Sequence, residues 1–237
     1  MNDINNKVAY ITGGSKGIGL GIAQVLINNG MRVAITSRSL QSAKKAAESL
    51  SKDPSRILAL ASDVSSLESE IRSVESVISH FGQLDVLVAN AGVGHLASIE
   101  NLSAAQWKET MDTNLTGVFN SVKASINALK ESKGYIITIA SLAGANFFAN
   151  GSAYNASKFG LVGFSQAIML DLRQYGIKVT TIMPGSVATN FNNHTVTEMD
   201  TWKIQPEDIG QIVADLLKMP PRTLPSKIEV RPSIPGK

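Results

Sequence analysis

A tyrosine and a lysine four residues apart, Tyr154 and Lys158, are the side chains whose types and spacing most directly offer chemistry. On a helix this spacing places both on one face. A free tyrosine ionises near pH ~10, and an ammonium group held beside a phenol favours the phenolate and lowers the pKa of the phenol. We therefore expect Tyr154 to donate or accept a proton near neutral pH. Taken alone, the spacing is more typical of an ordinary amphipathic face, so the rest of the chain decides whether a site surrounds the pair.

The composition excludes several classes of function. The 237 residues suffice for one large α/β domain, and the net charge of +3 is too small and too scattered for nucleic-acid binding. No apolar run approaches the ~20 residues that span a bilayer, and residues 1–7 lack the apolar core of a signal peptide. With no cysteine and three widely separated histidines, we expect neither a disulfide nor a metal site. We expect a cytoplasmic protein that does not bind membranes.

A glycine-rich turn follows the first predicted strand, residues 7–12, and precedes an apolar helical pattern. The turn reads Thr12-Gly13-Gly14-Ser15-Lys16-Gly17-Ile18-Gly19. A strand, a glycine turn and a helix present backbone N–H groups and the positive end of a helix to a phosphate. We expect Gly13 to form a tight turn, Gly17 to let the backbone approach a ligand, and Gly19 to permit close helix packing. A plain strand-to-helix turn is the alternative, but four glycines in seven residues favour a dinucleotide.

The junction after the second predicted strand, residues 31–36, bears on which dinucleotide binds. An acidic residue here favours the free 2′-hydroxyl of the adenosine ribose. The sequence instead has Arg38, whose guanidinium can hold a 2′-phosphate through two parallel hydrogen bonds. Lys16 in the glycine turn adds a second cation. Both could be solvated surface charges, but their joint placement predicts NADP(H) in preference to NAD(H).

Further candidate residues follow the carboxyl ends of later predicted strands, where open α/β sheets bind ligands. They are Asp63-Val64, Asn90-Ala91-Gly92, Ser141, and the segment Pro184-Gly185-Ser186-Val187-Ala188-Thr189. We expect Asp63 and Val64 to contact adenine, although Asp63 also fits simple turn chemistry. Asn90 is expected to brace neighbouring strands through hydrogen bonds.

Several helices are predicted around these motifs. A capping box of Ser65 and Glu68 is expected to start one of them. A long helix from Ser103 to about residue 129 contains Asn114, a poor mid-helix residue, which predicts a kink or a water-binding break; an exposed asparagine in an imperfect helix is the alternative. The helix over residues 152–175 is apolar nearly all round, which predicts that one side packs on the sheet and the other forms a subunit interface.

Strands that alternate with helices predict a single domain over residues 1–237. Its expected fold is a doubly wound parallel α/β sheet of the Rossmann type, with about seven strands in the order 3-2-1-4-5-6-7 and helices on both faces. The polar segment over residues 190–205 is typical of a mobile segment that covers the substrate, and it also fits a passive surface loop. Pro206 is expected to start the last helix.

Taken together, the motifs resemble the short-chain dehydrogenase/reductase family. The glycine turn, Asn90-Ala91-Gly92, Asn114, Ser141, Tyr154-x-x-x-Lys158 and Pro184-Gly185 occur in the family's order and at its intervals, over nearly the whole chain.

The resemblance implies a nicotinamide cofactor and a role for each matching residue. It implies that Tyr154 exchanges a proton with the substrate oxygen, and that Lys158 lowers the pKa of Tyr154 and holds the nicotinamide ribose. Ser141 would hydrogen-bond the substrate oxygen, and Asn114 would hold a water that completes a proton relay. The segment from Pro184 would cover the nicotinamide, with Val187 and Thr189 near its carboxamide.

The resemblance points to two different classes of substrate. Overall the chain looks like the 3-oxoacyl-(acyl-carrier-protein) reductases, but it has Tyr175 where they typically have arginine, residues 131–133 lack arginine, and their C-terminal Asp-Gly-Gly is absent. The ending over residues 224–232 looks more like the branch acting on small hydroxy acids, hydroxy amino acids and ketones. We expect an NADP-dependent small-carbonyl reductase that forms a homodimer or homotetramer through the helices around residues 103–129 and 152–175. A carrier-dependent reductase and a non-catalytic NADP sensor are the alternatives.

Overall fold

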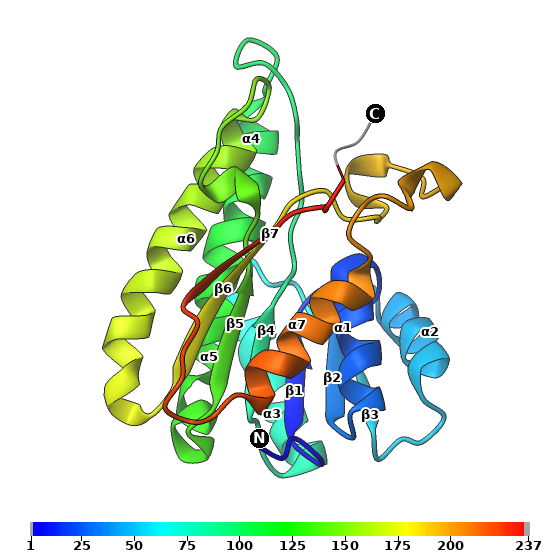
Figure 1. Ribbon diagram of the computed structural model, residues 1–237, viewed down its shortest axis with the longest axis vertical. Helices are drawn as coiled ribbons and strands as arrows, with labels where there is room; N and C mark the ends of the chain where they lie inside the picture. Colours follow the sequence, from blue (N-terminus) through cyan, green and yellow to red (C-terminus); the bar gives the residue numbers. More distant parts are fainter. Residues whose placement is uncertain (1, 235–237) are drawn as a thin grey trace.

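The protein, described as a computed structural model over residues 2–234, contains one seven-stranded parallel sheet (Figure 1). Met1 and residues 235–237, the end of the expected tail, lie outside the described residues. The strand order β3-β2-β1-β4-β5-β6-β7 confirms the prediction, and each neighbouring pair is parallel. The strands are β1 (Val8–Ile11), β2 (Arg32–Ser37), β3 (Ile57–Ala61), β4 (Val86–Ala89), β5 (Tyr135–Ile139), β6 (Lys178–Pro184) and β7 (Lys227–Val230).

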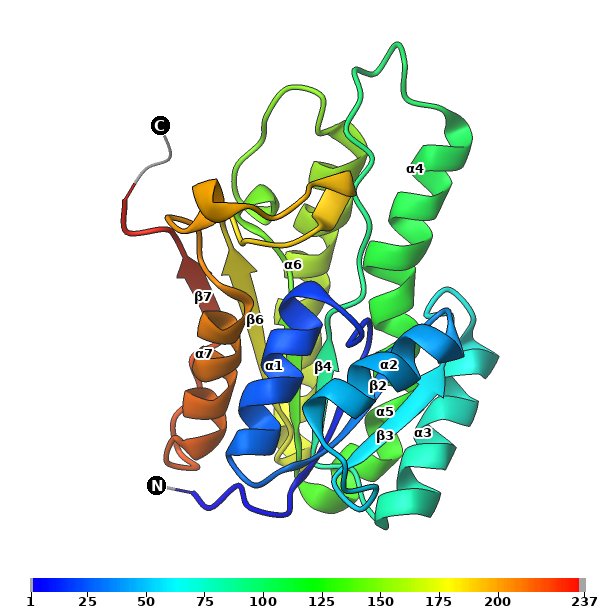
Figure 2. The same ribbon diagram turned by 90° about the vertical axis from the view of Figure 1, so that its right-hand side faces the viewer.

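Helices cover both faces of the sheet, and each face has its own core. The helices are α1 (Gly17–Asn28), α2 (Leu40–Leu50), α3 (Leu67–Phe81), α4 (Ala104–Met111), α5 (Gly117–Ser132), α6 (Ser152–Leu172) and α7 (Pro206–Lys218). Figure 2 shows α7, α1 and α2 on one face, with α5 and α6 on the other. Successive strand residues alternate between the cores, because Ala9 and Ile11 pack under α1 and α7 while Val8 and Tyr10 pack under α3 and α5. Strands buried on both sides explain the continuous apolar runs in the sequence.

Local side chains set where two of the helices begin. At α4, which begins where the long helix was predicted to start, Ser103 and Gln106 form a capping box. At α3 the prediction is wrong by one residue, because the N-cap is Ser66, whose hydroxyl accepts a hydrogen bond from the backbone N–H of Ser69 at 3.2 Å. Ser65 instead donates its hydroxyl to the Asp63 carboxylate at 2.7 Å. The turn that follows β3 therefore uses Ser65 before the helix starts.

The predicted break around Asn114 is confirmed. A π-helical turn, Asp112–Thr116, separates α4 from α5. Such turns insert an extra residue into the helix and often occur at functional sites. Gly117 follows the turn because a Cβ there would lie 2.6 Å from Cγ2 of Val64. The helix therefore passes very close to the chain that follows β3.

Helix α6 ends close to the predicted position. A 3₁₀ turn carries the chain to Tyr175, and Gly176 then adopts a left-handed conformation with φ of 77°. Apolar side chains remain exposed on the outer faces of α5 and α6, among them Phe119, Phe159 and Leu170. The subunit interface predicted there stays a prediction.

Two properties of residues 2–234 bear on membrane insertion and metal binding. None of the helices there is both long enough and apolar enough to cross a membrane. Within the same range, no group of three or more histidine, aspartate or glutamate side chains is placed to hold a metal ion.

Candidate active site

A cavity of about 1110 Å³, called here the large cavity, lies along the carboxyl ends of the parallel strands. Most of the residues predicted from the sequence line it: Gly13, Ser15, Lys16, Gly17, Ile18, Arg38, Asp63, Val64, Asn90, Ala91, Gly92, Tyr154, Lys158, Pro184, Gly185, Val187 and Thr189. Gly19, Asn114 and Ser141 are not in its lining. The topology thus brings together residues from six separate segments of the chain.

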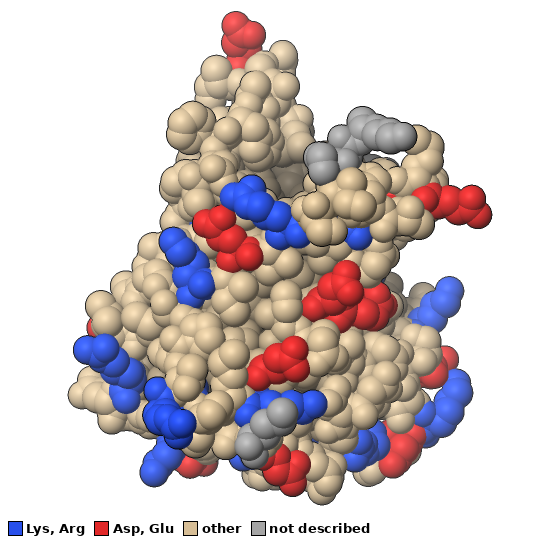
Figure 3. Space-filling view, viewed as in Figure 1, with Lys and Arg blue, Asp and Glu red and all other residues tan. Residues whose placement is uncertain are grey.

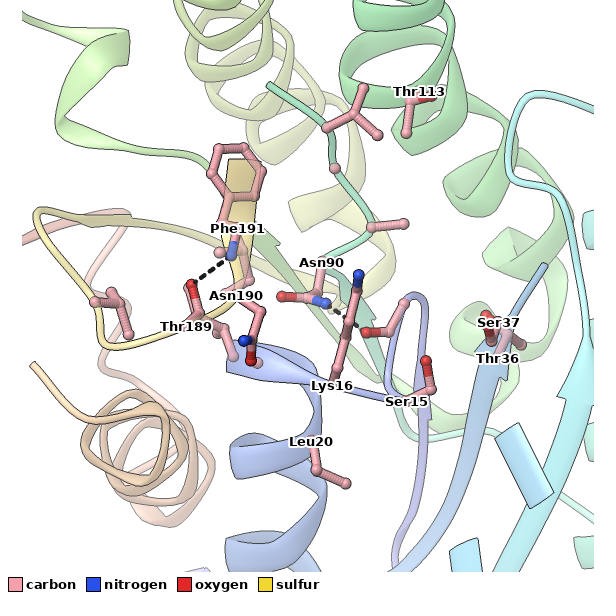
Figure 4. A pocket seen from close by; sticks show the side chains of 18 of the residues that line it. Ser15, Lys16, Leu20, Thr36, Ser37, Asn90, Thr113, Thr189, Asn190 and Phe191 are labelled. Atoms are coloured by element: carbon pink, nitrogen blue, oxygen red, sulfur yellow. Dashed lines mark hydrogen bonds between the residues drawn. The ribbon is translucent and has the colours of Figure 1, made fainter. Parts of the chain in front are cut away.

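The glycine turn after β1 approaches the chain that follows β4 at very short range. Gly13 and Gly17 adopt left-handed conformations, with φ of 64° and 55°. A Cβ on Gly19 would lie 2.6 Å from Nδ2 of Asn90, so only glycine permits the contact. The Asn90 side chain donates to the carbonyl oxygens of Thr12 and Gly13, at 2.9 and 3.2 Å. Figure 4 draws the second of these bonds. These bonds confirm that Asn90 braces the two strand ends.

The N-terminus of α1 is available to an anion. Lys16 occupies the N-cap position with an extended backbone, and its side chain makes no capping hydrogen bond. The first turn of α1 contains no acidic residue. The first backbone N–H groups of a helix lack partners within the helix, and together they carry a partial positive charge. The turn and the helix therefore form a cradle suited to a phosphate group.

Cations gather at the end of the large cavity next to β2. Arg38 follows β2, Lys16 follows β1, and Lys45 comes from α2; all three side chains line the cavity. Lys45 was not predicted from the sequence, although its helical spacing from Ser42 and Ser49, which also line the cavity, could have indicated it.

Carboxylates also occur at this end of the cavity. Nη1 of Arg38 lies 3.7 Å from Oε1 of Glu109 on α4, and Glu109 also contacts Nε2 of His95 at 2.8 Å. The Asp63 carboxylate accepts hydrogen bonds from the backbone N–H and the hydroxyl of Ser65. The Asp63 carboxylate therefore stabilises the turn that contains Ser65, and it also lines the large cavity.

Lys158 is buried at the opposite end of the large cavity. It is only 4% exposed, and its Nζ donates a hydrogen bond to the carbonyl oxygen of Ile139 at 3.0 Å. Nζ also lies 5.7 Å from the ring centroid of Tyr154, so the expected proximity of the pair is present. Burial lowers the pKa of Lys158 from 10.5 to about 8, because an ammonium group loses its hydration inside the protein.

The pKa of Tyr154 departs from the prediction. Burial of the phenol raises its pKa above 10.0, and hydrogen bonding with the Ser141 hydroxyl only partly opposes this shift. The expected lowering by Lys158 is therefore wrong for the side chains of the protein itself, because desolvation is the dominant effect. The hydrogen bond between the two hydroxyls places Ser141 next to Tyr154, as expected for the predicted catalytic residues.

Asn114 joins three segments behind the large cavity. Its Oδ1 accepts from the backbone N–H of Val93 at 2.8 Å, and its Nδ2 donates to the Val93 carbonyl and to Oγ of Ser157. A Cβ on Gly92 would lie 3.3 Å from Oδ1 of Asn114 and 3.7 Å from Nζ of Lys158. The side chain of Asn114 therefore fixes the loop after β4 next to Lys158. Its expected role in holding a water stays a prediction.

The segment over residues 190–205 contributes lining residues that the sequence analysis did not single out. Asn190, Phe191, His194 and Lys203 all line the large cavity. The ring centroid of Phe191 lies 5.8 Å from that of Tyr154, so an aromatic side chain lies beside the phenol.

An ionic cluster folds this segment back on itself. The Asp200 carboxylate accepts from Nε2 of His194 at 2.8 Å and from Nζ of Lys203 at 2.5 Å. These contacts, with a hydrogen bond from the backbone N–H of Thr197, hold the pKa of Asp200 well below its usual range. No periodic pattern in the sequence reveals such contacts, because they depend on how an irregular segment folds.

Comparison with known proteins identifies the family and agrees with the fold. Residues 7–200 match the short chain dehydrogenase family. The chain is 36% identical over 194 residues to trans-4-hydroxycyclohexanecarboxylate dehydrogenase of Sinomonas cyclohexanicum, an alignment that covers 78% of this chain and 74% of that protein.

Solved structures give the same result. The alcohol dehydrogenase of the archaeon Thermococcus sibiricus, complexed with 5-hydroxy-NADP, matches with a TM-score of 0.90 and 29% identity over 97% of each chain. The 3-ketoacyl-(acyl-carrier-protein) reductase of Brucella melitensis, complexed with NADH, matches with a TM-score of 0.88 and 26% identity over 97% of this chain and 98% of that one. The chain therefore belongs to the short chain dehydrogenase family of oxidoreductases.

Proposed function

We propose that this protein is an NADP(H)-dependent oxidoreductase that interconverts a small ketone, or an oxo acid, and its secondary alcohol. The observation that carries the proposal is the presence of Tyr154 and Lys158 at one end of the large cavity, with Ser141 hydrogen-bonded to Tyr154, and of the phosphate cradle and Arg38 at the other end. A proton-transfer group and a dinucleotide site thereby share one cavity.

The residues present fit a nicotinamide dinucleotide. The pyrophosphate would lie against Gly13, Gly17 and the N-terminus of α1. A Cβ on Gly17 would lie 3.3 Å from Cγ2 of Thr189, so a larger residue would narrow the gap between the glycine turn and Thr189. Arg38 and Lys16 would hold the 2′-phosphate of NADP(H). Further contacts would come from Ser15, Ile18, Asp63, Val64, Asn90, Ala91, Gly92, Pro184, Gly185, Val187 and Thr189. The bound cofactor would supply the hydride.

Side chains of the protein would supply the proton that the substrate oxygen receives. Tyr154 would donate its phenolic proton to the carbonyl oxygen of the substrate, and Ser141 would orient that oxygen through a hydrogen bond. The ammonium of Lys158 would stabilise the phenolate that remains, and this attraction is stronger in a site that excludes water. Asn114 would keep the loop over Lys158 in place while a water relay returns the proton.

A small substrate is favoured over a carrier-bound one. The Sinomonas relative acts, by its name, on a cyclic hydroxy acid, which supports a small hydroxy or oxo acid here. A 3-oxoacyl group on an acyl carrier is the second candidate, supported by the likeness to the Brucella reductase. One observation weakens this second candidate. An acidic carrier needs basic side chains to bind, but Nζ of Lys130 already lies over the ring of Tyr175, 3.9 Å from its centroid.

We further propose that the protein is cytoplasmic and assembles as a homodimer or homotetramer. Phe159 and Leu170 on α6 are 43% and 55% exposed, and Phe119 on α5 is 43% exposed. Burying these apolar side chains against a second copy would stabilise an assembly. Light scattering at micromolar concentration tests this, and a stable monomer would contradict it.

Following NADPH oxidation spectroscopically tests the function. The substrate panel contains cyclic ketones, small β-keto esters and a 3-oxoacyl thioester, with hydroxy amino acids run in the oxidative direction. Turnover of a small ketone or oxo acid supports the proposal, and a strong preference for the thioester favours the carrier-dependent alternative. Tight NADPH binding without turnover of any compound would favour the sensor.

A further inference from the structure

A second cavity, of about 520 Å³, adjoins the large cavity, and is called here the side cavity. The two share Gly185 and Ser186. The other residues lining the side cavity are Leu142, Ala143, Asn146, Phe147, Phe148, Trp202, Arg231, Pro232 and Ile234. Its volume falls in the ~300–1,000 Å³ range of sites for small molecules. Leu142 and Ala143 directly follow Ser141, so the side cavity begins next to the predicted substrate oxygen.

The walls of the side cavity are fixed relative to Tyr154. The neighbouring residue, Asn155, is buried, and its Nδ2 donates to the carbonyl oxygens of Ala143 and Asn146, each at 2.8 Å. Its Oδ1 accepts from the backbone N–H of Phe148 at 3.4 Å. The aromatic loop over residues 142–148 is therefore attached to α6 one residue beyond the phenol.

The opposite walls are held by the shared glycine and by the 190–205 segment. The N–H of Gly185 donates to the Val230 carbonyl at 2.8 Å, and a Cβ on Gly185 would lie 3.4 Å from Cδ of Pro232. Two backbone hydrogen bonds join Ile204 to Ser186 and Ala188, which places the preceding residues of this segment beside the strand end. Trp202 then lines the side cavity while Lys203 lines the large one.

The chemistry of the side cavity is aromatic with one cation. Of the residues described in its lining, Arg231 alone is ionisable. Its Nη2 donates to Glu229 at 3.0 Å, but this pair is exposed, and exposed pairs contribute little. A guanidinium has five N–H donors, which leaves others to bind a carboxylate in bidentate fashion. In the view of Figure 3, basic side chains lie below a hollow in the upper part of the molecule, with acidic side chains beside them.

We propose that the side cavity binds the carboxylate and part of the ring of a cyclic oxo or hydroxy acid, with Arg231 holding the carboxylate and Phe147, Phe148 and Trp202 contacting the apolar ring. The proposal rests on the proposed function and specifies its substrate as an apolar ring acid. Contact with aromatic faces removes apolar ligand surface from water, and the single cation selects an anion over its neutral analogue.

Binding measured without turnover tests the side cavity separately from catalysis. Cyclohexanecarboxylate and its neutral analogue cyclohexanecarboxamide are titrated into wild-type protein, Arg231→Gln and the control Arg222→Gln, with ligand-observed NMR as the readout. Arg222 is exposed and does not line either cavity described here. We expect the wild type and the control to bind the acid more tightly than the amide. Arg231→Gln should weaken binding of the acid by about tenfold and leave the amide unchanged.

Equal affinities of the wild type for acid and amide, or an unchanged affinity of Arg231→Gln for the acid, would overturn the proposal. So would failure of the acid to bind the wild type, the result expected if a second copy of the chain fills the side cavity. Reduction of cyclohexanone and 4-oxocyclohexanecarboxylate by NADPH is assayed in parallel. Arg231-dependent binding of the acid without turnover of either ketone contradicts the proposed reaction but not the side cavity, and turnover without acid binding contradicts the side cavity alone.

Discussion

Replacing Lys158 with methionine separates the cost of burying an ammonium group from the function that the group serves. Lys158 is 4% exposed, and burial lowers its pKa from 10.5 to about 8. At ~1.4 kcal/mol for each pH unit, this difference corresponds to about 3 kcal/mol of folding free energy at neutral pH. Methionine keeps the length of the side chain without the charge. Loss of the hydrogen bond to the Ile139 carbonyl oxygen lowers the stability of the variant by about 1 kcal/mol, which partly offsets this gain.

The pH dependence gives the effect its sign. Because the pKa of Lys158 is lower in the folded protein, the unfolded chain binds more protons between about pH 8 and 10.5. Raising the pH through this window therefore stabilises the folded wild type, while the methionine variant lacks this contribution. We expect the variant to be more stable than the wild type by about 2 kcal/mol at pH 7, and the difference to approach zero near pH ~9.5. Turnover should be lost at both pH values.

Urea unfolding followed by tryptophan fluorescence measures the difference, at one protein concentration so that assembly does not alter the comparison. Lys52→Met is the control, because Lys52 is exposed, and its stability should match the wild type at both pH values. A Lys158→Met protein no more stable than the wild type at pH 7 would refute the reasoning. An advantage that did not change with pH would refute it equally.

Three further predictions concern turnover and cofactor choice. Tyr154→Phe should reduce turnover by ~100-fold or more while NADPH affinity stays unchanged, because only the transferable proton is removed; near-normal rates would contradict the assignment. Arg38→Ala should raise the Kd of NADPH by about tenfold or more and leave that of NADH unchanged, and equal changes in a fluorescence titration would remove the 2′-phosphate argument. Glu109→Gln should tighten NADPH binding up to about fivefold, since the carboxylate 3.7 Å from Arg38 competes with the phosphate, whereas the control Asp112→Asn on the same helical stretch should change nothing.

Patterns between neighbouring residues predicted most of the fold. Strand alternation with helices predicted the sheet order, and a poor helix former at Asn114 predicted the break that proved to be a π turn. The reason for Gly117 was not predictable, because it depends on Val64, which lies far away in the sequence and next to it in space. The shift of the α3 cap from Ser65 to Ser66 likewise depends on which serine the Asp63 carboxylate binds.

The site was predictable as a set of residues but not as an environment. The strand ends located the residues around the large cavity, since their position follows from topology. The pKa of Tyr154 was not predictable, because its direction depends on how far burial outweighs a neighbouring charge. Phe191 and Lys203 were missed because an irregular segment has no period that would reveal which side chains face the cavity.

Helix α6 sets the relation between the two cavities. Tyr154 lines the large cavity, and Asn155, about 100° further round the helix, fixes the aromatic loop of the side cavity. The position of the aromatic loop relative to Tyr154 therefore depends on two adjacent residues of one helix, whereas Trp202 on the opposite wall belongs to the 190–205 segment. Among the described residues, neither Phe147 nor Phe148 forms a hydrogen bond with Lys158, so under our proposals substitutions in the loop would alter which acid binds and would leave proton transfer intact. Under the proposed function, a helix that carries Tyr154 and also anchors the aromatic loop would let substitutions at Phe147 or Phe148 change substrate preference without loss of chemistry.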